Sequence, residues 1–162
     1  MKRLVCSFAV LMAAVLCVCC AFAEQTVTLP ESSYRLTLPD EMTYDGPGNA
    51  AEGDDARFAY VWDEKKLDIG FFLRTNPGGA TLESIAGILR EKDDSIAIYR
   101  IQGVEMIVYR TKDPGDDPTG RGMLCIDYMF LDGDNIQEIC FWYGSKEAAA
   151  LTETIISSIT KD

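Results

Sequence analysis

Three stretches of the chain alternate apolar and polar residues on both sides of a short turn, a pattern typical of β-hairpins. The first spans residues 58–74, with the polar tetrad 63–66 between its halves. The second spans residues 96–109 and turns near Gln102 and Gly103. The third spans residues 122–143 and turns near Asp132 and Gly133. Because a hairpin joins neighbouring strands in opposite directions, the sequence predicts an antiparallel sheet.

Two further segments have the apolar spacing of amphipathic helices. Thr81 is a suitable N-cap for the first and Ser145 for the second. The apolar positions that follow the two caps are Leu82, Ile85, Ala86 and Leu89, then Ala148, Leu151, Ile155 and Ile159. A single apolar stripe on each helix indicates that both helices cover a sheet.

The remaining segments complete the predicted fold. Residues 25–29 and 34–38 predict two shorter strands, each ended by a proline, and residues 40–55 predict an exposed loop rich in Gly, Pro, Asp and Glu. Several strands are apolar on both sides, which favours a sheet covered on both faces. We therefore expect an α+β fold, with an antiparallel sheet of about six or seven strands and two main helices in an α/β/α sandwich.

This order of elements resembles that of the PsbP-like superfamily, which includes the extrinsic protein of photosystem II, a nuclear Ran-binding factor and small exported bacterial proteins. The likeness rests on YRLTLPDEM at 34–42, on TLESI at 81–85 and on IYRIQGVEMIVYR at 98–110 around Gly103. It covers nearly all of residues 24–162, and so predicts one PsbP-like domain there. The resemblance implies a non-enzymatic module that docks on a protein partner, and it transfers no catalytic residue.

The first 23 residues have the pattern of a secretory signal peptide. Lys2 and Arg3 precede an apolar run at 4–20, and small residues at Ala21 and Ala23 form a signal-peptidase site. We expect residues 1–23 to be removed and the exported chain to begin at Glu24 with no membrane span. It would then be secreted, or periplasmic at the cell envelope. A lipoprotein is the less favoured alternative, because Val18 is large for the position before a lipidated cysteine.

Composition excludes several classes of function. The chain has a formal net charge of −11, which disfavours binding to nucleic acid and to anionic membranes because both are polyanions. It contains no histidine, so a Ser-His-Asp triad, a Cys-His dyad and a His-ligated zinc site are excluded. We therefore expect a protein that is not an enzyme, with no catalytic residue, cofactor or metal site. The sequence does not predict an oligomeric state.

Removal of the signal peptide would leave two cysteines, Cys125 and Cys140, too few for a four-thiolate zinc site. If Asp132 and Gly133 form a two-residue hairpin loop, these cysteines are directly opposite and can form a disulfide. An even number of cysteines in an exported chain allows such a bond.

A wider loop changes the relation of the two cysteines. The tight register sets Asp127 opposite Glu138, and like charges in such a pair destabilise the strands. The wider register sets Asp127 opposite Cys140 instead, and it makes Cys125 and Cys140 diagonal neighbours, too far apart for an unstrained bond. A disulfide and two buried thiols therefore both stay open.

Three other groups of residues have two readings each. Trp62, Trp142 and Tyr143 either pack in the core or form a docking surface for a partner. Two acidic loops either bind calcium or are solvated turns, and we prefer solvated turns for both. The first loop contains Asp113, Asp116 and Asp117, and the second contains Asp132, Asp134 and Asn135. Asp127 and Glu138 would act as a glycosidase pair only in a cleft.

The sequence therefore favours an exported, non-catalytic protein-interaction module at the cell envelope, with an unknown protein partner. The alternative is an extracytoplasmic binder of a small ligand or divalent cation, in a pocket between sheet and helix or in the acidic loops.

Overall fold

The structure is a computed structural model that describes residues 23–46, 56–76, 78–93, 95–110 and 123–162. Its centre is a seven-stranded sheet with the order β3-β4-β5-β9-β8-β7-β6, in which every pair of neighbours is antiparallel. Its strands are β3 (Thr43–Gly46), β4 (Ala56–Trp62), β5 (Leu67–Thr75), β6 (Ala97–Ile101), β7 (Val104–Arg110), β8 (Leu124–Asp132) and β9 (Asn135–Tyr143). A smaller sheet has the order β1-β2-β10, with β1 (Glu24–Thr28), β2 (Tyr34–Pro39) and β10 (Thr160–Lys161).

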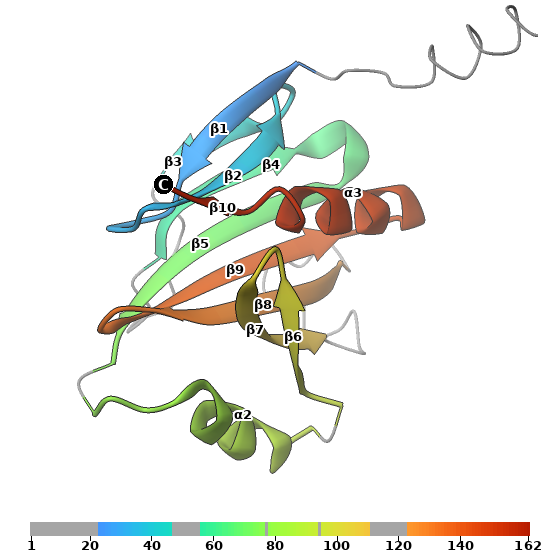
Figure 1. Cartoon of the computed structure of the whole chain (residues 1–162). Helices are drawn as coiled ribbons and strands as arrows, with labels where there is room; N and C mark the ends of the chain where they lie inside the picture. The colour runs from blue at the N-terminus through green and yellow to red at the C-terminus, as the bar shows by residue number, and fades with distance from the viewer. Residues whose placement is uncertain (1–22, 47–55, 77, 94, 111–122) are drawn as a thin grey trace, which may run out of the picture.

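Two α-helices, α2 (Leu82–Arg90) and α3 (Lys146–Ile156), lie on opposite faces of the large sheet (Figure 1). On β7, Met106 belongs to the apolar cluster that includes Ile155 of α3. The next residue, Ile107, belongs to a different cluster with Ala86 of α2. Because successive strand residues point to opposite faces, these clusters are on the two sides of the sheet. The predicted α+β class is confirmed, and the layer on the α3 side also contains the smaller sheet.

Both helices begin at the predicted caps. The Thr81 hydroxyl oxygen accepts a hydrogen bond from the backbone N–H of Ser84 at 3.2 Å. The Ser145 hydroxyl oxygen accepts one from the backbone N–H of Ala148 at 3.0 Å. Each bond satisfies one N–H group that has no partner within the helix. These two helix starts could therefore be predicted from local sequence alone.

The predicted turn at Gln102 and Gly103 joins β6 to β7. Both residues have positive φ, 48° and 83°, and Ile101 pairs with Val104 across the turn. Two consecutive positive φ angles are typical of a type I′ turn, whose twist matches that of the flanking strands.

The third hairpin has the register that sets Asp127 opposite Cys140, but its loop has two residues and is not the wider loop expected for that register. Asp132 pairs with Asn135, so Gly133 and Asp134 form the loop. Gly133 has a φ of 61° and Asp134 has no positive φ, which is the pattern of a type II′ turn with glycine first. This register keeps Asp127 from direct opposition to a second carboxylate.

Two strands differ from the sequence-based expectation. β3 lies within the segment expected to be a loop, and it pairs with β4 through Tyr44 and Tyr60. β10 pairs with β2, where Thr160 is opposite Arg35. These strands have four and two residues, too few for a periodic signal, and their pairing partners are distant in sequence.

The main core lies between the large sheet and the layer formed by α3 and the smaller sheet. Phe71, Phe130 and Phe141 are almost fully buried there, together with Leu36 and Leu38 of β2. Burial of each such side chain stabilises the fold by about 1.5–3 kcal/mol. Within the described part of the chain, no helix is both long enough and apolar enough to cross a membrane.

Candidate functional site

Four polar side chains gather on the α2-side face of β8 and β9. Asp127 of β8 is the cross-strand partner of Cys140 of β9. Cys125 lies two residues before Asp127 on β8, and Glu138 lies two residues before Cys140 on β9. Side chains two residues apart on a strand point to the same face, so all four lie together. The motifs are Cys-Ile-Asp and Glu-Ile-Cys, and the isoleucine of each faces the main core. We call these four residues the thiol–carboxylate cluster.

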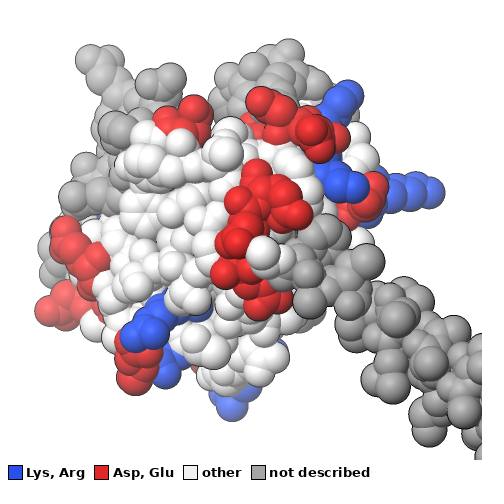
Figure 2. Space-filling view, turned by 90° about the horizontal axis from the view of Figure 1, so that it is seen from above, with Lys and Arg blue, Asp and Glu red and all other residues white. Residues whose placement is uncertain are grey.

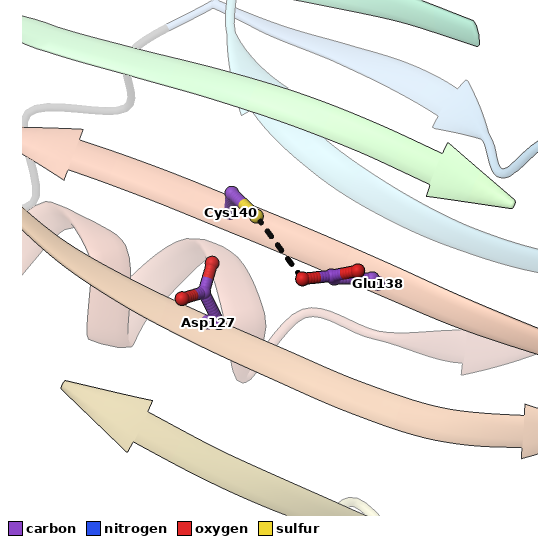
Figure 3. A group of neighbouring side chains, drawn as sticks. All are labelled: Asp127, Glu138 and Cys140. Carbon is purple, nitrogen blue, oxygen red and sulfur yellow. Dashed lines mark hydrogen bonds between the residues drawn. The ribbon is translucent and has the colours of Figure 1, made fainter. Parts of the chain in front are cut away.

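The cluster is close-packed and largely buried. The Cys125 thiol donates a hydrogen bond to Oδ1 of Asp127 at 3.5 Å, and the Cys140 thiol donates one to Oε1 of Glu138 at 3.8 Å (Figure 3). One sulfur or oxygen atom from each of Asp127, Glu138 and Cys140 lies within 4.8 Å of the others. Cys125 and Cys140 are 8% and 6% exposed, and both are free thiols, so the structure contains no disulfide between them.

Arg74 of β5 completes the polar site, and the sequence analysis did not single it out. One guanidinium nitrogen of Arg74 lies 2.9 Å from Oε2 of Glu138. β5 pairs with β9, with Phe72 opposite Glu138, so Arg74 projects from the same face. Local sequence gives no signal for this contact, because it depends on which strand lies beside β9.

Burial and neighbouring charges shift two groups in this cluster. Burial raises the pKa of Asp127, and hydrogen bonds from the two thiols together with the charge of Arg74 oppose that shift. A hydrogen bond with Cys125, followed by burial and the nearby carboxylates, raises the pKa of Cys140 well above its usual value. The Cys140 sulfur is therefore a protonated thiol at neutral pH, which is a poor nucleophile.

A cavity of about 310 Å³ borders the cluster between α2 and the sheet. Asp127 and Glu138 form part of its polar wall, and Leu89, Ile107 and Met129 form part of its apolar wall. A pocket of this kind, with a few polar groups in an apolar surround, is typical of small-ligand sites.

The three predicted docking aromatics do not form one patch. Trp62 is 7% exposed and belongs to the main core, with Lys65 Nζ 5.8 Å from its ring centroid. Tyr143 is partly buried against that same core. Trp142 points to the opposite face, where its ring lies over Gly70. Burial removes Trp62 from any exposed surface, and a docking role for the other two stays a prediction.

A different aromatic group is exposed at the β3 edge of the large sheet. Tyr44 is 59% exposed, and its ring meets that of Tyr60 edge-on with 5.6 Å between centroids. The ring of Tyr60 in turn lies beside that of Phe58, with 6.3 Å between the two centroids. At the opposite edge, Tyr99 of β6 is 51% exposed. The sequence analysis missed Tyr44 because it lies in the segment expected to be a loop.

The acidic loops give little support to a calcium site. Asp113, Asp116 and Asp117 lie outside the described residues. Oδ2 of Asp132 accepts a hydrogen bond from Ser32 at 2.5 Å, and Oδ1 lies 3.8 Å from Lys161 Nζ. Both oxygens of Asp132 therefore already have protein contacts.

Comparison with known proteins identifies the fold. No protein-family model and no curated protein matches the chain. A solution structure of cyanobacterial PsbP (CyanoP) from Synechocystis sp. PCC 6803 is similar over 87% of this chain and 94% of its own, with a TM-score of 0.60 and 8% identity. A crystal structure from Bacteroides thetaiotaomicron VPI-5482 is similar over 85% of this chain and 48% of its own, with a TM-score of 0.54 and 12% identity. The chain has a PsbP-like fold, as the sequence resemblance predicted.

Proposed function

We propose that the protein is an exported, non-catalytic interaction module that docks on a protein partner at the cell envelope. The observation that carries this proposal is the PsbP-like fold, which extends over 87% of the chain. The resemblance to the PsbP-like superfamily implies a module that docks on a protein partner, and this step is an analogy of fold.

The chemistry of the chain supports a non-catalytic role. It contains no histidine, the residue that most often acts as a general base near neutral pH. The raised pKa of the Cys140 thiol disfavours nucleophilic catalysis.

The β3 edge is the surface that we propose for docking. Tyr44 is exposed there beside the partly buried rings of Tyr60 and Phe58. Tyrosine is enriched among the residues that contribute most to protein binding. Figure 2 looks down on the end of the molecule where β1 and β3 lie, and it shows an area without charged side chains that is bordered mainly by acidic side chains and in part by basic ones. Such a surface suits a partner with an apolar centre and basic residues around it.

Export is the second part of the proposal. Removal of residues 1–23 would leave every described strand intact, because β1 begins at Glu24.

The direct test is capture of the tagged, exported protein from its native envelope after chemical cross-linking, with identification by mass spectrometry. We expect one dominant partner that binds again when both purified proteins are mixed. Recovery of the tagged protein from the cytoplasm would contradict export, and failure of the purified pair to associate would contradict docking.

The cavity beside the thiol–carboxylate cluster favours a second candidate function, an extracytoplasmic binder of a small ligand or divalent cation. The cavity has a volume of about 310 Å³ and borders two carboxylates. Native mass spectrometry of protein purified without chelator tests this candidate. A bound mass that disappears on denaturation supports it, and an unliganded mass in the presence of envelope extract contradicts it.

A further inference from the structure

We propose that Cys125, Asp127, Glu138 and Cys140 form a binding site for a divalent cation of the zinc class, with one donor atom from each residue. This inference rests on the second candidate function, and it names the site and the kind of cation.

The donor set itself selects this class of cation. Each of the two neighbouring strands contributes one sulfur and one oxygen on the same face. Zinc accepts four ligands in a tetrahedron and combines cysteine sulfur with carboxylate oxygen. Calcium and magnesium instead require six or more oxygen ligands, so two sulfur donors disfavour them. The exclusion of His-ligated and four-thiolate sites does not apply to this mixed set.

The sulfur–oxygen distance within each strand fits such a tetrahedron. Bonds of about 2.3 Å to sulfur and about 2.0–2.2 Å to oxygen require adjacent sulfur and oxygen ligands to be about 3.5 Å apart. The two sulfur–oxygen distances are 3.5 Å for Cys125 with Asp127 and 3.8 Å for Cys140 with Glu138. The widest separation among the donors of Asp127, Glu138 and Cys140 is within 4.8 Å. Cys125 is not among these three, so its side chain must move toward the other donors to complete a set of four ligands.

Arg74 orients one of the ligands. It lies 2.9 Å from Oε2 of Glu138, whereas Oε1 of the same carboxylate lies toward Cys140. Carboxylate ligands of metals commonly have such an outer partner, which fixes their orientation. Arg74 is therefore a positioning residue, and its positive charge also offsets part of the negative charge of the ligands.

The surroundings suit a buried cation. Ionised groups are costly to bury unless they are paired or coordinate a metal. Two thiolates and two carboxylates carry four negative charges, and a divalent cation together with Arg74 supplies three positive ones. The adjoining cavity borders Asp127 and Glu138, so a cation can reach the site without separation of the strands.

The binding step is a proton exchange without oxidation or reduction. Two S–H bonds break, two metal–sulfur bonds form, and both protons pass to the solvent. The carboxylates contribute oxygen lone pairs. Affinity is therefore expected to rise steeply with pH.

The test is anaerobic titration of the reduced, purified protein with Co²⁺, a spectroscopic substitute for Zn²⁺. We expect one Co²⁺ per chain, a thiolate-to-cobalt charge-transfer band, about two protons released per metal ion, and displacement by one equivalent of Zn²⁺. Cys125→Ser and Cys140→Ser should each weaken this band, and Asp127→Asn should lower affinity with the band retained. Glu153→Gln, at an exposed position of α3 on the other face of the sheet, is the matched control and should bind like the wild type.

Arg74→Gln provides a second test that does not require substitution of a buried residue, because the Arg74 side chain is 46% exposed. We expect it to lower affinity by about 10–100-fold while the charge-transfer band remains, and Arg74→Lys should restore part of the loss. This result would support the positioning role even if the cysteine variants do not fold.

Three results would overturn the proposal, and they differ in what they imply for the second candidate function. Stoichiometric binding without a charge-transfer band would reject this site but leave cation binding elsewhere in the chain. Absence of any stoichiometric binding would reject both the site and the cation-binding function. A disulfide between Cys125 and Cys140 in protein isolated from its native compartment would reject the site, because the sulfur atoms would then no longer be available as thiolates.

Discussion

Asp127 of β8 lies directly opposite Cys140 of β9, so the two cysteines of the described chain are diagonal to each other. Each thiol is hydrogen-bonded to the carboxylate two residues away on its own strand. Of the two alternatives left open by the sequence, a disulfide or two buried thiols, this register therefore gives the thiols, grouped with two carboxylates.

The raised pKa of Asp127 predicts a specific pH dependence of stability. Because the folded state holds this proton more tightly than the unfolded state does, the free energy of unfolding falls as pH rises from the ordinary value of 3.8 through the raised pKa. Each unit of difference between the two states corresponds to about 1.4 kcal/mol. Asp127→Asn removes this loss, so its stability relative to the wild type should increase with pH across that window and then stay constant.

Urea unfolding of metal-free protein at a series of pH values measures this difference, with Asp134→Asn as the exposed control. A relative stability of Asp127→Asn that is flat or falls over the window would show that burial does not raise the pKa of Asp127.

Gly70 of β5 is expected to be intolerant of a side chain. A Cβ atom there would lie 2.8 Å from a ring carbon of Phe72 and 2.9 Å from one of Trp142. Gly70→Val should therefore lower the free energy of unfolding by about 1–3 kcal/mol, although valine favours strands. Chemical denaturation of both variants and the double variant tests this, because Trp142→Ala should relieve part of the cost. Equal costs in both backgrounds would show that the contact with Trp142 does not contribute to the cost.

Two glycines in different backbone conformations should respond to alanine in opposite directions. Gly133 has a φ of 61° in the β8–β9 turn, so Gly133→Ala should destabilise the protein by about 1–2 kcal/mol. Gly87 lies within α2, and a Cβ there meets no atom within 4 Å. Gly87→Ala should stabilise by about 0.5–1 kcal/mol. A change of the same sign in both melting temperatures would contradict these assignments.

The exported chain is predicted to begin at Glu24. N-terminal sequencing and intact-mass measurement of the secreted or periplasmic protein test this directly. Ala23→Tyr should block cleavage because the residue before the cut must be small, whereas Phe22→Leu should leave it unchanged. A mature chain that begins at Cys19 or Cys20 and carries lipid would support a lipoprotein instead.

Much of the fold could be predicted because its signals are local. The caps at Thr81 and Ser145 are single residues beside helical apolar stripes, and the turn at Gln102 and Gly103 lies between alternating strands. The pairing of Thr160 with Arg35 could not be predicted, since a two-residue strand has no period of its own.

The candidate site could be predicted only in part. Cys125, Asp127, Glu138 and Cys140 were each considered from sequence, but as a disulfide pair and as an acid pair. Whether the four residues form one cluster depends on the choice between two strand registers. In one register Asp127 faces a thiol, and in the other it faces a second carboxylate. Arg74 joins the site through the pairing of β5 with β9, a non-local contact.

The most direct test of the docking proposal compares two exposed tyrosines at opposite edges of the large sheet. Tyr44 of β3 is 59% exposed and adjoins the ring of Tyr60. Tyr99 of β6 is similarly exposed, at 51%, but lies at the opposite edge of the sheet. The dissociation constant for the partner captured from the envelope should be measured with Tyr44→Ala and with Tyr99→Ala. Docking at the β3 edge predicts that Tyr44→Ala weakens binding by about 10-fold or more and that Tyr99→Ala changes it by less than about 3-fold. Unchanged affinity in Tyr44→Ala, with the fold intact, would contradict the proposed docking surface.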